Sequence, residues 1–277
     1  MTDLRRELDA PYTLTGEQIE FYAENGYVKL KNVFGAPVLE HYGRAISERV
    51  AELSTDALPI EQRTTYGKAF LQVTNLWRQS ELVKEFVMGQ RLGRIAAELM
   101  GVTGVRLYHD QALYKEAGGG LTPWHADQYY WPVATEKTVT AWVPLQATPL
   151  EMGPLAFCRK SHRLQIGRDL EIGDKSEMTL KQALAKFETE ETAFELGEVS
   201  FHAGWTFHRA GVNTSGRPRA VMTMIYMDEM MRLAVPKNKN QVADAKAWCP
   251  GVLVGNVIDS EINPVVWSDA AVMNYKR

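Results

Sequence analysis

Residues 118–128 read GGGLTPWHADQ, so a glycine-rich loop leads into a histidine and an aspartate that stand two positions apart. In an extended strand, side chains two positions apart point to the same face. His125 and Asp127 can therefore reach a single point, as two ligands of one metal ion must. Because His-x-Asp tripeptides also occur by chance on protein surfaces, this interpretation requires a third ligand elsewhere in the chain.

The third ligand is expected to be one of two histidines that lie six positions apart, His202 and His208. In a continuous strand they would be about 20 Å apart, so one metal ion can bind only one of them, unless Ala203 and Gly204 turn the chain. His208 is favoured because Arg219 follows it after a turn-rich stretch, and His202 is then a structural histidine. Two imidazoles and a carboxylate with open positions are the ligand set typical of non-haem Fe(II).

Arg219 lies at the mouth of an apolar stretch, residues 220–226, which is expected to form a buried strand. A buried cation requires an anionic partner. A carboxylate co-substrate beside the metal would satisfy both Arg219 and the open metal positions. The sequence leaves open whether His208 and Arg219 share one ladder or face each other across a roll.

Composition places the chain among globular proteins and excludes several partners. Of its 277 residues 45% are hydrophobic, and the formal net charge is −3 with 31 scattered basic residues, so nucleic acid is not an expected partner. No run approaches the roughly 20 apolar residues of a membrane span, and the polar N-terminus carries no signal core. Two free buried thiols, Cys158 and Cys249, in a cytoplasmic protein are favoured over one disulfide. The oligomeric state is not indicated.

The first hundred residues are predicted to be mostly helical. Residues 15–18 have the form of a capping box, and the helix that they begin should end at the turn pair 25–26, before a strand at 27–30. Pro37 is expected to open a helix that reaches Leu53. Apolar spacing predicts another helix over residues 80–100, closed by Gly101. Residues 54–79 are ambiguous and indicate a loop or short helices.

From residue 105 the pattern changes to short strands interrupted by glycine and proline. Strands are predicted at 105–114, 138–145, 155–157, 199–201, 206–208 and 220–227. Residues 164–193 should form an exposed insertion with a helix at 178–187. One domain over 1–277 is predicted, with a helical part at about 15–100, a β core at about 104–230 and an irregular C-terminal extension. The fold class is mainly β with flanking helices, an antiparallel barrel or jelly roll with N-terminal helices packed on the major sheet.

The chain resembles the phytanoyl-CoA dioxygenase family of Fe(II)/2-oxoglutarate oxygenases, whose pattern is His-x-Asp, a distal histidine and an arginine eleven residues later. His125, Asp127, His208 and Arg219 fit that pattern, and the resemblance covers roughly residues 15–230. Further features similar to the family are Trp142, the run Gly153-Pro154-Leu155 and Asn213. The chain departs from the family at Ala210, where some members have a serine that contacts the co-substrate, and at residues 158–162, which replace a commoner small-residue approach to Gly-Ser-His.

The resemblance implies a double-stranded β-helix, a cupin-like jelly roll, and an enzyme that uses Fe(II) and 2-oxoglutarate. It implies that His125, Asp127 and His208 are the metal ligands and catalytic residues. It also implies that Arg219 pairs with the distal carboxylate of 2-oxoglutarate and that Trp142 lines that pocket.

Further side chains are predicted to contact the co-substrate or the substrate. Gln111, on the strand predicted at 105–114, is a candidate contact of 2-oxoglutarate. For His109 and Asp110, which precede it, a buried hydrogen-bond network is favoured over metal ligation. The segment before residue 80 is expected to cover the pocket mouth, and an aromatic run follows the metal ligands. The substrate-binding residues predicted in these two segments are Gln72, Asn75, Trp77, Tyr129 and Trp131. For each of them core packing is the alternative.

The expected function is hydroxylation of an aliphatic C–H bond in a small, apolar organic substrate, with succinate and CO2 as co-products. A cupin-like metal-binding protein without turnover, such as a sensor or binding module, is the alternative. A metal isomerase that does not use 2-oxoglutarate is disfavoured, because it would not need Arg219. The sequence leaves open whether the substrate is free, CoA-bound or carrier-bound, and whether hydroxylation, desaturation or cyclisation follows.

Overall fold

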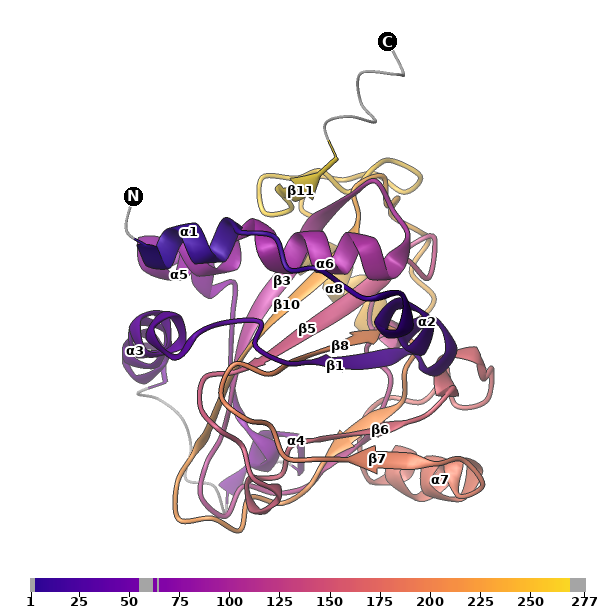
Figure 1. The fold of residues 1–277 in the computed structure, drawn as a ribbon. Helices are drawn as coiled ribbons and strands as arrows, with labels where there is room; N and C mark the ends of the chain where they lie inside the picture. Colours follow the sequence, from indigo (N-terminus) through magenta and orange to yellow (C-terminus); the bar gives the residue numbers. More distant parts are fainter. Residues whose placement is uncertain (1–2, 55–61, 64, 270–277) are drawn as a thin grey trace.

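The computed structural model describes residues 3–54, 62–63 and 65–269, and two antiparallel sheets form its centre (Figure 1). The large sheet has the order β1 (Tyr27–Leu30), β8 (Val199–Ala203), β5 (Thr138–Pro144), β10 (Arg219–Asp228), β3 (Gly104–Lys115) and β11 (Val265–Ser268), and β2 (Leu71–Thr74) also pairs with β3. The small sheet has the order β4 (Thr122–His125), β9 (His208–Ala210), β6 (Leu155–Cys158) and β7 (Thr189–Glu191).

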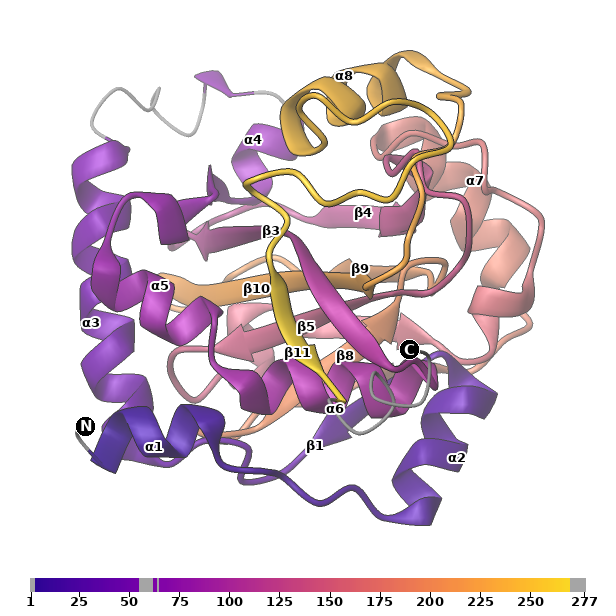
Figure 2. The ribbon, with the colours of Figure 1, turned by 90° about the horizontal axis from the view of Figure 1, so that it is seen from above.

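The N-terminal helices cover the outer face of the large sheet, as predicted (Figures 1 and 2). Helix α6 (Gln90–Met100) packs on β3, β5, β10 and β11, and α1 (Asp3–Asp9) packs against it. Helices α3 (Ala36–Leu53) and α5 (Glu81–Val87) pack against α1 and against each other. The buried stripe of α6 has the spacing of an amphipathic helix and consists of Leu92, Ile95, Ala96 and Leu99. Among the described residues, no helix has the length and apolar character that crossing a bilayer requires.

The predicted capping box is confirmed at the start of α2 (Gly16–Asn25). The Thr15 side chain accepts from Gln18, the Gln18 side chain accepts from the Thr15 backbone, and Gly26 ends the helix at φ 84°. The helix predicted over 80–100 is instead two helices, α5 and α6, because Gly89 interrupts it and lies against Leu8. A β-carbon on Gly89 would stand 2.9 Å from that of Leu8. Cys158 and Cys249 are free and buried, as expected.

The strand predicted at 206–208 begins two residues later, as β9. The polar groups before it bond to other parts of the chain: Thr206 Oγ1 donates to the Gly26 carbonyl, and the Phe207 amide donates to Ser161 Oγ. The helix predicted at 178–187 is α7 (Asp174–Leu184). The segment that holds it is not fully exposed, because Leu180 and Leu184 are buried in a cluster with Trp124.

The C-terminal part is more regular than predicted, since α8 (Lys239–Trp248) and β11 follow residue 228. Within α8 only Gln241 is buried, so the helix has no apolar stripe that a sequence pattern would reveal. The segment predicted as ambiguous before residue 80 forms α4 (Thr65–Ala69), β2 and the short helix η2 (Leu76–Arg78), and residues 55–61 and 64 lie outside the described residues.

Asn213 holds the turn between β9 and β10. Its side-chain amide is fully buried and donates to the carbonyls of Lys115, Glu116 and Arg217 at 2.8–3.0 Å. Its Oδ1 accepts from the backbone and the hydroxyl of Ser215. One side chain therefore ties the turn that precedes Arg219 to the end of β3.

Replacing Asn213 with Ala should lower the free energy of unfolding by about 2–4 kcal/mol, because each buried polar group left without a partner costs about 1–3 kcal/mol. Urea unfolding followed by circular dichroism measures the change, with the exposed neighbour Thr214→Ala as the control. A loss below about 1 kcal/mol, the range of ordinary surface substitutions, would contradict this role.

Candidate metal centre

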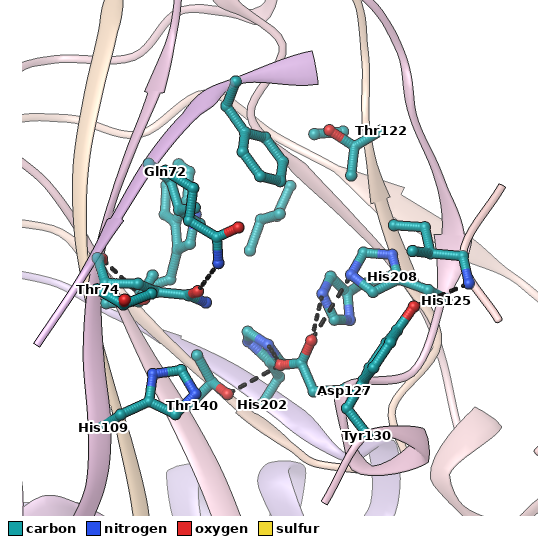
Figure 3. Close-up of a pocket in the computed structure, with 18 of the residues that line it drawn as sticks. Gln72, Thr74, His109, Thr122, His125, Asp127, Tyr130, Thr140, His202 and His208 are labelled. Carbon is teal, nitrogen blue, oxygen red and sulfur yellow. Dashed lines mark hydrogen bonds and ion pairs between the residues drawn. The ribbon is translucent and has the colours of Figure 1, made fainter. Parts of the chain in front are cut away.

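Three side chains that could hold a metal ion meet between the two sheets. The candidate ligand atoms of His125, Asp127 and His208 all lie within 4.8 Å of one another (Figure 3). His125 ends β4 and pairs directly with His208 of β9. Ala126 between the first two is extended, at φ −125° and ψ 130°, so Asp127 at the start of η3 (Asp127–Tyr129) stays on the same face as His125. His208 lies on the small sheet and Arg219 on the large one, so the two face each other across the roll.

Asp127 is held by one of its two oxygens. Oδ2 accepts from Thr140 Oγ1 at 2.9 Å and lies 3.2 Å from Nε2 of His202. Oδ1 lies 3.6 Å from Nε2 of His125 and 3.6 Å from Nε2 of His208. In Figure 3 Thr140 and His202 lie on one side of Asp127, and the other two histidines lie on the opposite side. Oδ1 is therefore the oxygen left for a metal ion.

The two ligand histidines are oriented in the same way. Nδ1 of His125 is 2.8 Å from the carbonyl of Pro123, and Nδ1 of His208 is 3.0 Å from the carbonyl of Thr206. A carbonyl only accepts, so each Nδ1 carries the hydrogen and each Nε2 presents a lone pair to the cluster.

Burial sets the charge states that metal ligation requires. It lowers the pKa of His125 and of His208 to about 4, so both imidazoles are neutral at pH 7. Burial acts to raise the pKa of Asp127, but the neighbouring imidazole of His208, the hydrogen bond with His202 and the imidazole of His125 hold it well below its ordinary value. Asp127 is therefore ionised, and the cluster offers two neutral nitrogens and one anionic oxygen.

His202 is the nearest competitor for the role of ligand. It lies on β8, 1% exposed, and its ring centroid is 4.4 Å from that of His208. Its Nε2 contacts Asp127 Oδ2, and its Nδ1 has no hydrogen-bond partner among the described residues. His202 therefore contacts the carboxylate of a candidate metal ligand. The sequence predicted a structural histidine here but did not predict this contact.

The cluster opens into a cavity of about 450 Å³. Five of the predicted co-substrate and substrate residues line it: Gln72, Gln111, Trp131, Trp142 and Arg219. The Gln72 amide donates to Gln111 Oε1, which joins β2 to β3 along one wall (Figure 3).

Arg219 is an almost fully buried cation, 1% exposed. Its Nη1 donates to the carbonyl of Gly153, and its Nε has no hydrogen-bond partner in the described part of the chain. The guanidinium lies 5.3 Å from the ring centroid of Trp142, whose Nε1 is also buried and unpartnered there. Burial lowers the pKa of Arg219 to about 9, so the group is still cationic at pH 7 and would be stabilised by an anion in the cavity.

The hydroxyl of Thr122 lies opposite Ala210, the position where some members of the family that the chain resembles have a serine. Thr122 pairs with Ala210 across β4 and β9, and it lines the cavity. Thr122 Oγ1 accepts from Nζ of buried Lys115 at 3.2 Å, which leaves the hydroxyl hydrogen of Thr122 for another acceptor. Lys115 is itself the strand partner of Arg219, so this end of the cavity is rich in donors.

Asn75, Trp77 and Tyr129 do not line the cavity. Asn75 takes a positive φ of 49° at the turn into η2, and Trp77 packs against the core beneath the N-terminal helices. Tyr129 lies in η3, where its carbonyl accepts from Gln241 of α8. The prediction assumed strand alternation for residues 129–131, and the helical turn of η3 departs from it.

Several residues of the cavity were not predicted from the sequence. They are His109, Thr122, Tyr130, Thr140, Glu171, His202, Asp244 and Trp248. The position of Thr140 could have been predicted, because it stands two residues before Trp142 on β5 and its side chain therefore lies on the same face of the strand as that of Trp142. No such pattern predicts Asp244 and Trp248, because α8 has no apolar periodicity.

Comparison with known protein families gives one match. The family model for phytanoyl-CoA dioxygenase (PhyH) matches residues 22–221. A probable alpha-ketoglutarate-dependent hypophosphite dioxygenase of Stutzerimonas stutzeri is 23% identical over 226 residues, which are 76% of this chain and 77% of that protein.

Solved structures share the fold. The non-heme alpha-ketoglutarate-dependent carbocyclase SnoK from nogalamycin biosynthesis matches with a TM-score of 0.76 and 23% identity, over 93% of this chain and 100% of that chain. EctD from S. alaskensis, solved with 2-oxoglutarate and 5-hydroxyectoine, matches with a TM-score of 0.68 and 18% identity, over 92% and 90% of the two chains. These likenesses confirm the predicted cupin-like jelly roll with flanking helices.

Single replacement of His125, Asp127 or His208 by Ala should abolish Fe(II) binding in anaerobic calorimetry, because each variant removes one of three ligands. His202→Ala should weaken binding by about 10–100-fold, as is usual when a residue that orients a ligand is lost. His41→Ala, on the exposed face of α3, is the control. Full loss of binding in His202→Ala together with normal binding in His208→Ala would show that the ligand histidine is misassigned.

Proposed function

Because this chain belongs to the phytanoyl-CoA dioxygenase family, we propose that it is an Fe(II)- and 2-oxoglutarate-dependent oxygenase that hydroxylates an aliphatic C–H bond of a small organic substrate. Succinate and CO2 are the co-products. The observation that carries the proposal is a single cavity that holds both a His-Asp-His cluster and a buried arginine without an anionic partner in the described chain. A metal cluster alone fits many proteins, whereas the adjacent arginine fits an anionic co-substrate.

In this proposal the metal is held by Nε2 of His125, Nε2 of His208 and Oδ1 of Asp127. Two neutral imidazoles and one carboxylate match the preference of Fe(II). Bound iron and 2-oxoglutarate would supply the oxidising chemistry that no side chain can supply. Thr140 and His202 keep Oδ2 of Asp127 turned away from the metal, so that one oxygen is presented in a fixed direction.

Arg219 would bind the distal carboxylate of 2-oxoglutarate by charge-assisted hydrogen bonds. The guanidinium is already fixed by the Gly153 carbonyl and the Trp142 ring, so little conformational freedom is lost on binding. Thr122, whose oxygen accepts from Lys115, would donate its hydroxyl hydrogen to the same carboxylate. It would thereby take the role of the serine that some family members have at the position of Ala210. Gln111 faces the same cavity and is the proposed polar contact along its wall.

Other residues would position the substrate and exclude water. Tyr130 accepts a hydrogen bond of 3.0 Å from the backbone of Ile172, which fixes the 164–193 segment against the cavity beside the metal ligands. Gln72 closes the opposite wall through Gln111. The substrate would occupy the space beside Trp131, with its reacting carbon near the metal ligands.

The outcome after hydrogen removal is proposed to be hydroxylation, with desaturation and cyclisation as variants of the same chemistry. Structural neighbours named as a carbocyclase and an epimerase indicate that this fold supports several outcomes. A metal-binding protein without turnover is the second candidate, and the metal cluster on its own supports it equally well.

The proposal is tested by a panel of candidate substrates, scored by succinate released from 2-oxoglutarate in the presence of Fe(II) and by product mass. At least one substrate should give succinate with a product 16 mass units heavier, the mass of one oxygen atom, or 2 units lighter if desaturation follows. Tight Fe(II) binding with no succinate above background for any substrate would favour the protein without turnover.

Arg219→Ala should raise the apparent Michaelis constant for 2-oxoglutarate at least about 30-fold. Breaking a buried charge pair costs about 2–5 kcal/mol, and every 1.4 kcal/mol changes an affinity tenfold. Steady-state succinate release measures the constant. Arg217→Ala, an exposed arginine of the preceding turn, should leave it unchanged. An unchanged constant in Arg219→Ala would show that the co-substrate is held elsewhere or is not used.

A further inference from the structure

The two ends of the cavity have opposite polarity. Strand β3 runs along it: Lys115 pairs with Arg219 at one end, and Tyr108 and His109 contact α8 at the other. Six residues of extended strand separate the two ends by about 20 Å. The end with Arg219 is the proposed co-substrate end. The end beside α8, called here the α8 end, consists of His109, Glu171, Asp244 and Trp248, and it is left for the substrate.

Asp244 places a carboxylate in the wall of the α8 end. It lies on α8 and accepts a hydrogen bond of 3.4 Å from the hydroxyl of Tyr108. Burial raises the pKa of Asp244 to about 7, and hydrogen bonds from Tyr108 and Trp248 only partly oppose that shift. The described residues do not compensate fully for the burial of an ionised carboxylate at Asp244, and a cation in the cavity would stabilise it.

His109 adds a second acceptor to the α8 end. It is 6% exposed, and its Nδ1 lies 3.3 Å from the carbonyl of Asp110, so Nδ1 carries the hydrogen. Burial lowers the pKa of His109 to about 4, so the ring is neutral and Nε2 is an acceptor. Nε2 has no hydrogen-bond partner among the described residues, and the ring lines the cavity near Asp127 (Figure 3).

The α8 end has aromatic walls and few cations. Trp248 stacks on His109 with ring centroids 4.7 Å apart, and Trp131 lines the same cavity. Lys239 lies 3.3 Å from Glu171 and offsets its charge, which leaves Asp244 unbalanced. Within the described chain, Arg219 is the sole lysine or arginine that lines the cavity, and it lies at the opposite end.

We propose that the substrate is a ring-bearing amine, whose protonated nitrogen binds Asp244 and His109 beside Trp248 while its ring lies against Trp131. A carboxylate next to aromatic faces is the arrangement that recognises an organic cation. An anionic group at the same place would meet Asp244 and Glu171 without a compensating cation. This inference rests on the proposed function, and it changes the apolar substrate predicted from the sequence to one that also carries a basic group.

The test uses three probes of similar size, 2-phenylethylamine, 2-phenylethanol and 3-phenylpropionate, on the full chain with 2-oxoglutarate and diamagnetic Zn(II) in place of iron. Saturation-transfer NMR gives their dissociation constants. The amine should bind at least about tenfold more tightly than the carboxylate, since a charge-assisted hydrogen bond contributes about 1.5–3 kcal/mol. In Asp244→Asn the two constants should become similar, whereas Asp259→Asn, an exposed carboxylate outside the cavity, should keep the wild-type ratio.

Glu171→Gln should reduce the preference less than Asp244→Asn, because Lys239 already offsets Glu171. Equal binding of amine and carboxylate to the wild-type chain, no binding of the amine, or an unchanged preference in Asp244→Asn would each overturn the inference. Binding of 2-oxoglutarate is measured in the same samples. Amine preference without 2-oxoglutarate binding counts against the proposed function alone, and 2-oxoglutarate binding without amine preference counts against this inference alone.

Discussion

The site depends on the register between β4 and β9, which sets His125 directly opposite His208. A slip of one residue would turn either side chain to the other face of the small sheet. The two strands also repeat one local arrangement, because each histidine bonds through Nδ1 to the carbonyl two residues before it. The pairing and these two hydrogen bonds therefore fix both the positions and the tautomers of the two imidazoles. Because Ala126 is extended, the side chain of Asp127 lies on the same face as that of His125 and reaches the two imidazoles.

Asp127 links this pair to the large sheet. Thr140 and His202, on the neighbouring strands β5 and β8, both contact Oδ2. The carboxylate is thus fixed by strands of one sheet while its free oxygen faces histidines of the other. A largely buried anion between the sheets, with 19% of its side chain exposed, would be destabilised if these contacts were lost. The relative placement of the two sheets and the geometry of the cluster therefore depend on each other.

The sequence predicts those features of the site that depend on the spacing of residues along the chain, and it does not predict contacts that only folding creates. The pairing of His125 with Asp127 is predicted by strand periodicity, and Arg219 is predicted by the need of a buried cation for a partner, so the sequence alone indicates these three positions. His202 and Thr140 act through Asp127, which folding brings to them. The spacing from Trp142 indicates which face Thr140 shares, but no spacing indicates its contact with Asp127. Trp77 and Tyr129 show the converse, since their segments lie near the cavity while short helical turns direct their side chains elsewhere.

The same distinction separates the two halves of the cavity. Apart from Asp127, which begins η3, the proposed metal and co-substrate side chains belong to strands whose register is fixed by ladders of backbone hydrogen bonds, so a change at one position disturbs its neighbours. Asp244 and Trp248 belong to α8, which meets β3 through side chains, namely a stacked ring and one hydroxyl. Substitutions on α8 can therefore alter the charge and shape of the α8 end while the register that holds the metal ligands stays intact. In the proposed function, the metal chemistry and the recognition of the substrate would therefore depend on different kinds of contact within one cavity.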